Sequence, residues 1–240
     1  MKVGLFDSGI GGINVLSELV KKYPHNHYIY YGDTKNLPYG NKSKDELIKL
    51  SSNIINFLIN KQVDVIIIAC GTISSNCYNE LKEKYNVPIY DIITPTLDFL
   101  RCSSYNKIGV IATTRTIESK IFDIKEKDIF MKDTPSFVPI IENNKIHENE
   151  EVIKKELECF KDSNIESLVL GCTHYPLLSN VINKYLSIPL INMGTCLCEE
   201  IRMVGNEELK IELYFSKLTD EIRMNIENVL ESNYIIEEVC

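Results

Sequence analysis

The chain has 240 residues, a length that suits one large α/β domain or two small lobes. Its hydrophobic fraction of 44% and charged fraction of 25% are typical of globular proteins and exclude disorder, collagen and coiled coil as the general class. The net charge of −8 is spread along the chain, which argues against a nucleic-acid partner because phosphate binding needs a clustered basic face.

Short apolar runs alternate with longer segments of helical period, a pattern typical of βαβ units and a parallel sheet. The expected strands span residues 3–6, 28–31, 65–69, 88–90, 108–112, 137–141, 168–170 and 188–191. The expected helices span residues 12–22, 44–60, 74–84, 116–122, 148–161, 176–185 and 219–231. Short, nearly continuous apolar strands are expected where helices cover both faces of a sheet. The fold class is therefore predicted to be α/β.

Two parts of the sequence echo each other. Residues 63–72 and 165–174 each contain an acidic residue, an apolar strand, a small residue, a cysteine and a hydroxyl side chain. A weaker echo links residues 2–9 with 107–114 at nearly the same offset. Generic βα-turn chemistry is one explanation of these echoes. The other, which we favour, is two similar lobes related by pseudo-twofold symmetry with the active site between them.

Breaks in the pattern place the expected lobe boundaries. A proline interrupts residues 93–96, and a polar Gly-Asn turn follows Val204. We therefore expect an N-terminal lobe made of residues 1–95 and 206–240, and a second lobe made of residues 96–205.

The eight cysteines indicate a reducing compartment rather than a disulfide framework. The chain is too large to need disulfides, its first residues reach Asp7 before any signal-like apolar region develops, and its apolar runs are too short to span a membrane. We expect a cytoplasmic protein in which most cysteines are small buried hydrophobes. Cys77, Cys102, Cys159 and Cys240 are assigned to that class. Cys196 and Cys198 lack a second cysteine pair at zinc spacing, so no metal is expected.

The polar residues of the echoed segments fall at the carboxyl ends of expected strands, where open α/β sheets bind ligands. These segments are residues 7–9, 70–72 and 172–174. A cysteine at the start of a helix sits in the positive end of the helix dipole, which favours thiolate and lowers the thiol pKa. The plain alternative is that each cysteine only packs beneath its helix. Two matched cysteines in two matched lobes favour a shared chemical role for Cys70 and Cys172.

Two thiols on opposite sides of a small ligand suit inversion at a carbon acid, because one base removes a proton and a conjugate acid delivers another to the opposite face. The neighbouring residues suit an amino acid. The hydroxyls of Thr72 and Thr173, with backbone N–H groups, can bind a carboxylate, and Asp7 can take an ammonium group. His174 can hold the proton that the nearby thiol exchanges.

Five motifs, in this order, resemble those of the glutamate racemases, members of the cofactor-independent aspartate/glutamate racemase superfamily. They are Asp7-Ser8-Gly9-Ile10-Gly11-Gly12, Gly32-Asp33-Thr34 with Leu37-Pro38-Tyr39-Gly40, Ala69-Cys70-Gly71-Thr72, Pro139-Ile140-Ile141-Glu142 and Gly171-Cys172-Thr173-His174-Tyr175-Pro176-Leu177-Leu178. The similarity runs through nearly all of the chain, and the first motif combined with the last is highly specific.

The resemblance implies a two-lobed α/β fold and racemisation of glutamate without pyridoxal phosphate or another cofactor, supplying D-glutamate for peptidoglycan. It implies that Cys70 acts on the α-proton of D-glutamate and Cys172 on that of L-glutamate, with Asp7 and His174 assisting. It also implies a glutamate substrate, and homodimers are common in the family. The substrate-binding residues carried over by position are Asp7, Ser8, Tyr39, Gly40, Gly71, Thr72, Glu142, Thr173 and His174.

The chain departs from the family at Gly71, where the usual residue is asparagine. The Gly71 N–H remains, and loss of one uncharged hydrogen bond costs on the order of 1 kcal/mol of binding. Two alternatives therefore stay open: an aspartate racemase of the same superfamily, since one methylene gives only about 1–3 kcal/mol of discrimination, or a non-catalytic paralogue that binds an acidic amino acid or a protein partner. A pyridoxal-phosphate racemase is disfavoured because no lysine lies in a recognisable cofactor motif.

Overall fold

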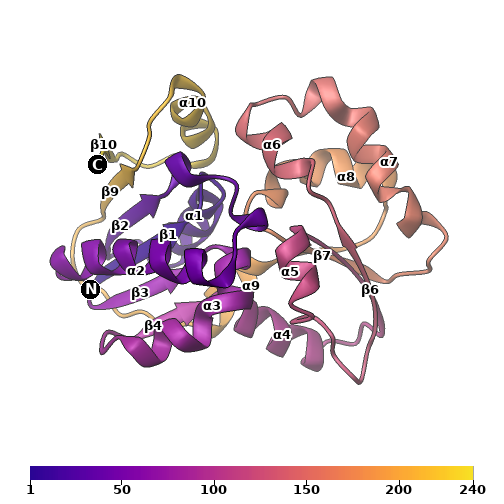
Figure 1. Cartoon of the computed structure of the whole chain (residues 1–240), viewed down its shortest axis with the longest axis horizontal. Coiled ribbons are helices and arrows are strands. Elements are labelled where there is room, and N and C mark those ends of the chain that lie inside the picture. Colours follow the sequence, from indigo (N-terminus) through magenta and orange to yellow (C-terminus); the bar gives the residue numbers. More distant parts are fainter. Residues whose placement is uncertain (240) are drawn as a thin grey trace.

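The computed structural model describes residues 1–239 and has two lobes, each built on a parallel sheet (Figure 1). The first sheet has the order β10-β9-β2-β1-β3-β4 and the second has the order β6-β5-β7-β8. The strands of the first sheet are β1 (Lys2–Asp7), β2 (His27–Gly32), β3 (Val65–Ile68), β4 (Ile89–Asp91), β9 (Lys210–Phe215) and β10 (Ile235–Glu238). Those of the second are β5 (Lys107–Ala112), β6 (Asp128–Asp133), β7 (Ser167–Gly171) and β8 (Leu190–Asn192).

Strands β1 to β4 of the first sheet and β5 to β8 of the second follow one topology. In each lobe the second strand along the chain pairs with one edge of the first strand, the third pairs with its other edge, and the fourth lies beyond the third. Strands β3 and β7 therefore occupy equivalent places, and Cys70 and Cys172 follow equivalent strands. The α/β fold with two similar lobes is confirmed, whereas the boundaries at residues 95 and 206 stay a prediction.

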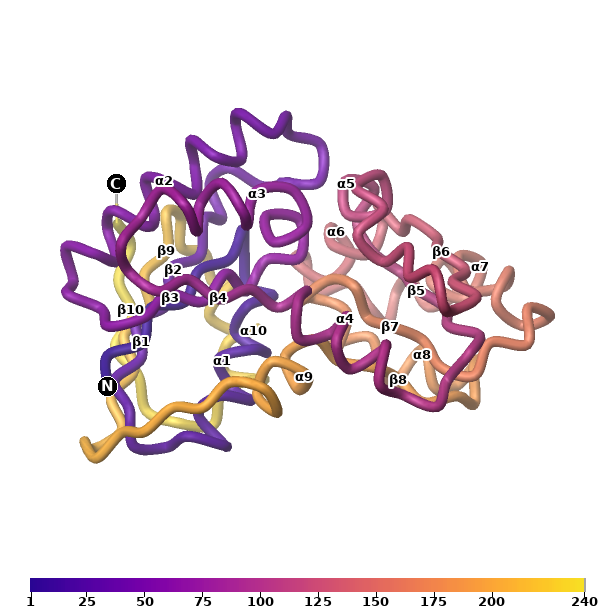
Figure 2. Tube along the Cα trace, turned by 90° about the horizontal axis from the view of Figure 1, so that it is seen from below, coloured from indigo at the N-terminus to yellow at the C-terminus, as the bar shows by residue number. Residues whose placement is uncertain are grey.

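Helices cover both faces of the first sheet (Figure 2). Helices α2 (Lys44–Asn60) and α3 (Gly71–Lys84) pack on one face, and α1 (Gly12–Lys22) and α10 (Asp220–Val229) pack on the other. The alternation along β1 explains this arrangement, because Leu5 joins the apolar cluster beneath α1 while Phe6 joins the one beneath α2.

The second sheet is covered in the same way, and its core continues into that of the first lobe. Helices α4 (Ile93–Cys102) and α9 (Met193–Glu200) share one apolar cluster with α1 and with Val110 of β5. Helices α6 (Phe137–Glu142), α7 (Glu150–Lys161) and α8 (Ser179–Tyr185) pack on the other face, and the short α5 (Thr114–Glu118) follows β5. This shared core connects the two lobes below the carboxyl ends of their strands.

Several predicted elements differ from the structure. Residues 137–141 form helix α6 instead of a strand, because a short apolar run has the same appearance in a buried helix as in a strand. Strands β6, β9 and β10 and helices α4 and α9 were not predicted. These strands carry charged residues that break the apolar pattern. Pro95 lies in the first turn of α4, where a missing N–H costs no intrahelical hydrogen bond, so it does not interrupt the chain as expected.

Some of the cysteines outside the cavity are buried, and others are exposed. Cys77 is buried as predicted, but Cys102 and Cys159 are exposed near the ends of their helices, so that part of the prediction is wrong. Cys196 and Cys198 are buried in α9. Cys240 lies outside the described residues. Within residues 1–239, no three His, Cys, Asp or Glu side chains are grouped to hold a metal ion, and no helix is long and apolar enough to cross a membrane.

Candidate active site

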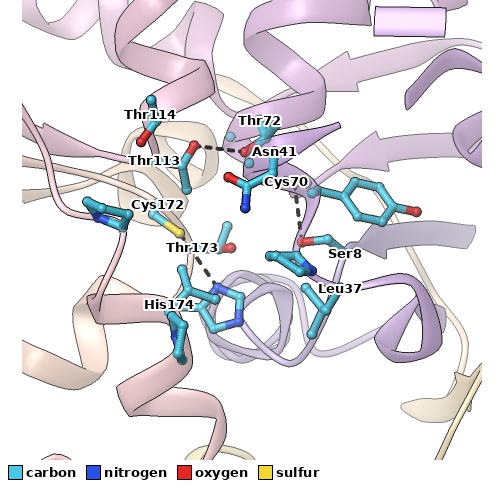
Figure 3. Close-up of a pocket in the computed structure, with 17 residues that line it drawn as sticks. Ser8, Leu37, Asn41, Cys70, Thr72, Thr113, Thr114, Cys172, Thr173 and His174 are labelled. Atoms are coloured by element: carbon cyan, nitrogen blue, oxygen red, sulfur yellow. Dashed lines mark hydrogen bonds between the residues drawn. The ribbon is translucent and has the colours of Figure 1, made fainter. Parts of the chain in front are cut away.

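A cavity of about 120 Å³ lies between the lobes at the carboxyl ends of their strands. The first lobe contributes Ser8 and residues 37–41 and 70–72, and the second contributes residues 113, 114, 135, 138, 139 and 172–174. An engineered cavity of roughly 150 Å³ holds benzene, so this space suits a small molecule rather than a nucleotide or a polymer. Figure 3 shows Cys70 and Cys172 reaching the cavity from different lobes.

Cys70 lies in the turn between β3 and α3, as the residue directly before α3, and its thiol is buried. The Sγ–H donates to Oγ of Ser8 at 3.6 Å. Burial, reinforced by the negative charge of Asp7, raises the pKa of Cys70 to about 12 even though the N–H of Ile73 acts in the opposite direction. The prediction that the helix terminus would lower this pKa is therefore wrong, because desolvation outweighs the helix dipole.

Cys172 is paired with a histidine. Its Sγ lies 3.6 Å from Nδ1 of His174, and Nε2 of the same ring lies 2.5 Å from Oε1 of Glu142. Burial acts to lower the pKa of His174, but the hydrogen bonds to Cys172 and Glu142 outweigh it and raise this pKa well above its usual value. The ring is therefore expected to carry a proton on both nitrogens, which leaves Nδ1–H directed at sulfur. Only a 3₁₀ turn at Tyr175–Leu178 follows this cysteine, in place of the predicted helix start.

Asp7 and Glu142 were predicted to bind substrate, but neither lines the cavity. The carboxylate of Asp7 accepts from the Gly9 N–H at 2.8 Å and from the Thr173 hydroxyl at 3.0 Å, and burial raises its pKa. Glu142 accepts from the Ile10 N–H at 3.1 Å as well as facing the imidazole. Both carboxylates lie behind the cavity wall, and direct substrate binding by either stays a prediction.

The glycine-rich turn after β1 serves close packing between the lobes. A Cβ atom at Gly11 would collide with Nδ1 of His174 and Oγ1 of Thr173. Asn14, one turn into α1, donates its side-chain N–H to the carbonyl of Thr173 at 2.9 Å. This turn is therefore shaped to fit residues 172–174 of the other lobe.

Thr72 and Thr173 line the cavity, and their hydroxyls already take part in hydrogen bonds within the protein. Oγ1 of Thr72 lies 2.9 Å from Oγ1 of Thr113 across the lobes, and the proton of Thr173 is directed at Asp7. Ser8, Tyr39, Gly40 and Gly71 also line the cavity. The oxygen of Thr173 thus remains an acceptor that an ammonium group can use.

Several lining residues were not identified from the sequence. They are Leu37, Pro38, Asn41, Thr113, Thr114, Pro135, Val138 and Pro139. The internal repeat could have identified Thr113 and Thr114, because Thr113 follows β5 just as Ser8 follows β1. The remaining residues lie on loops and on the start of α6, whose placement depends on how the lobes meet.

A substituent at Gly71 would crowd the opposite lobe. A Cβ atom there would lie 3.0 Å from the carbonyl oxygen of Gly171 and 3.5 Å from Cε of Met193. The absence of a side chain therefore lets the first turn of α3 approach the end of β7, which brings the two thiol-bearing turns together.

Residues 13–201 match the Asp/Glu/Hydantoin racemase family model. The chain is 36% identical to a glutamate racemase of Hydrogenobaculum sp., over all of this chain and 96% of that protein. It is 35% identical to the glutamate racemase of Aquifex pyrophilus, over 99% of this chain and 97% of that protein. The crystal structure of Francisella tularensis glutamate racemase in complex with D-glutamate superposes with a TM-score of 0.88 at 31% identity, covering 100% of this chain and 97% of that chain.

The fold and the site define a racemase with its chemistry between two α/β lobes, and the chain belongs to the Asp/Glu/Hydantoin racemase family. It is therefore an isomerase. Its full-length relatives named above are glutamate racemases, which confirms the resemblance indicated by the five sequence motifs.

Proposed function

We propose that this protein interconverts L-glutamate and D-glutamate through Cys70 and Cys172. The observation that carries the proposal is that two buried thiols, on equivalent strand ends of two similar lobes, line one small cavity. A substrate held between them presents one face of its α-carbon to each sulfur. Removal of the α-proton by one sulfur and delivery of a proton by the other inverts the centre.

The surroundings of the two sulfurs suggest which direction the described arrangement is prepared for. Cys70 keeps its proton, since its pKa is about 12, and so suits the role of acid. Cys172 has the N–H of a protonated His174 beside its sulfur and suits the role of base. Cys172 then takes the α-proton of L-glutamate, and Cys70 gives its own proton to the opposite face. The product is D-glutamate, with the proton now on Cys172 and the negative charge on Cys70.

The enzyme must then restore its starting protonation. Proton exchange of both thiols with water, aided at Cys172 by the imidazole of His174, returns each sulfur to the form it had before turnover. The two thiols, water and the imidazole of His174 carry every proton transfer in this sequence of steps. We therefore expect turnover without pyridoxal phosphate or metal, and activity should survive exhaustive chelation and carbonyl reagents.

The substrate is expected to be glutamate and not aspartate, because the full-length relatives are named glutamate racemases. The corresponding role is supply of D-glutamate for peptidoglycan in the cytoplasm. Incubation with each enantiomer of both amino acids, followed by chiral chromatography, tests the preference. Turnover of aspartate but not glutamate would assign the alternative activity, and turnover of neither would favour a non-catalytic binding protein.

Solvent deuterium tests the two-thiol mechanism. With L-glutamate in deuterated water, the D-glutamate formed in the first few per cent of reaction should carry deuterium at Cα while the remaining L-glutamate stays largely unlabelled. Product gains its hydrogen from the thiol opposite the base, and thiol protons exchange readily with water. Mass spectrometry of the separated enantiomers gives the answer. Early deuterium in L-glutamate, at a rate matching product formation, would indicate a single base and refute the mechanism.

A further inference from the structure

The wall of the cavity contributed by residues 37–41 belongs to a loop with little regular structure. This loop connects β2 to α2 and contains only two short 3₁₀ turns, Thr34–Asn36 and Tyr39–Asn41. Their backbone hydrogen bonds, from Asn36 N to Asp33 O at 3.2 Å and from Lys42 N to Tyr39 O at 3.1 Å, are local. Local bonds shape the turns but do not fix the loop against the cavity, so side chains must do so.

The carboxylate of Asp33 accepts hydrogen bonds from the side chains that fix the loop. Asp33 follows β2, is buried, and accepts the Tyr39 hydroxyl on Oδ2 at 2.5 Å. Its Oδ1 accepts the hydroxyl of Ser216, just beyond β9, at 2.7 Å, and the Asn36 side-chain N–H groups lie 2.9 and 3.0 Å from the two oxygens. Asp33 therefore ties the cavity loop to two strands of the first sheet, since its own N–H also donates to the carbonyl of Asp7 at 3.0 Å.

Tyr39 connects Asp33 to the cavity that holds the two thiols. Its ring is 2% exposed, lines the cavity and belongs to the same apolar cluster as Cys70. Burial and the neighbouring Asp33 raise the pKa of Tyr39 far above its usual value, so the phenol keeps its proton and is always the donor in this bond. The next residue, Gly40, faces Thr113 of the other lobe. A shift of Tyr39 would therefore move the loop at the point where it spans the two lobes.

We propose that Asp33 is a positioning residue for racemisation, which holds Tyr39 and thereby the loop of residues 37–41 against the substrate cavity. The inference rests on the proposed racemase activity. A carboxylate is suited to this role because its two oxygens accept hydrogen bonds from three neutral side chains, whereas an asparagine would offer one oxygen and turn an N–H group toward another donor.

The test compares Asp33→Asn, Tyr39→Phe and the double variant with the wild type. Asp33→Asn should raise KM for glutamate about tenfold with a smaller fall in kcat, because the loop shapes the binding cavity while both thiols remain in place. Tyr39→Phe keeps the ring and removes only the donor, so it should raise KM in the same direction. The double variant should be little worse than the more impaired single variant, because both substitutions break the same bond.

The matched control is Asp123→Asn, the same substitution at an exposed carboxylate in the turn between α5 and β6, which should leave KM unchanged. A KM of Asp33→Asn within twofold of the wild type would overturn the inference, as would strictly additive effects in the double variant. If Asp33→Asn does not fold, Tyr39→Phe decides the question, and an unchanged KM for that variant rejects the positioning role. Absence of racemisation by the wild type would instead reject the proposed function.

Discussion

Nε2 of His174 lies 2.5 Å from Oε1 of Glu142, and this contact joins a cavity residue to a carboxylate outside the cavity. The hydrogen bond with Glu142 is one of the two that keep the imidazole protonated beside Cys172. Glu142 therefore acts on the reaction through His174.

Glu142→Gln should lower the pKa of His174 and reduce kcat from L-glutamate about tenfold, because a charged hydrogen-bond partner is replaced by a neutral one. Since the protonated ring is the active form, the alkaline limb of the kcat profile should move to lower pH. Initial rates across pH, followed by chiral chromatography, measure both effects. The exposed Glu148→Gln serves as the control. An alkaline limb that does not move would show that Glu142 has no influence on this histidine.

Replacement of either cavity thiol should abolish racemisation in both directions, because one base cannot serve both faces of the α-carbon. Cys70→Ala and Cys172→Ala should keep the fold, as judged by circular dichroism and thermal unfolding. Cys77→Ala is a matched control, since Cys77 is also buried but does not line the cavity. A Cys172→Ala variant that retains more than a few per cent of wild-type turnover in both directions would contradict the assignment.

Gly71→Ala should destabilise the protein by about 1 kcal/mol, because the new Cβ would lie 3.0 Å from a carbonyl oxygen at the end of a buried strand, which cannot move freely. Gly71→Asn carries the same Cβ and adds the amide that the family usually has. Comparison of the two variants therefore isolates the amide, which should lower KM severalfold relative to Gly71→Ala if it reaches the substrate. Variants as stable as the wild type in thermal unfolding would show that the lobes accommodate a side chain here.

The stability of the protein should fall as pH rises, from pH 6.5 upward through His174 and from pH 9 upward through Cys70. The pKa of His174 is raised above 6.5 in the folded state, so its contribution is fully present below pH 6.5 and is lost as pH rises through the raised value. The pKa of Cys70 rises from 9.0 to about 12, so its contribution is lost between those values.

Urea unfolding of His174→Asn and Cys70→Ala at a series of pH values checks this division. His174→Asn should flatten the curve of unfolding free energy from pH 6.5 upward, and Cys70→Ala should flatten it only above pH 9. A His174→Asn curve that runs parallel to the wild type between these two values would contradict the raised pKa of the histidine.

The sequence predicted strands correctly where burial on both faces of the sheet requires a continuous apolar run. Strands buried on both faces, such as β1 and β3, are nearly continuous apolar runs, and they were placed to within two residues at each end. The strand β6 at the edge of its sheet is half-exposed and carries charges at both ends, so the same criterion missed it. The apolar run of α6 was misassigned because five residues cannot distinguish a buried turn of helix from a strand.

The sequence by itself determined the α/β class, the internal repeat and the presence of Cys70 and Cys172 at equivalent strand ends, because these depend on the order of residues along the chain. Only the tertiary structure decided the protonation of these groups and the composition of the cavity wall. Burial, reinforced by the negative charge of Asp7, reversed the expected pKa shift of Cys70, since desolvation depends on neighbours that are distant in sequence. The packing of the two lobes likewise decides that Thr113 lines the cavity. It also decides that Asp7 and Glu142 do not line it.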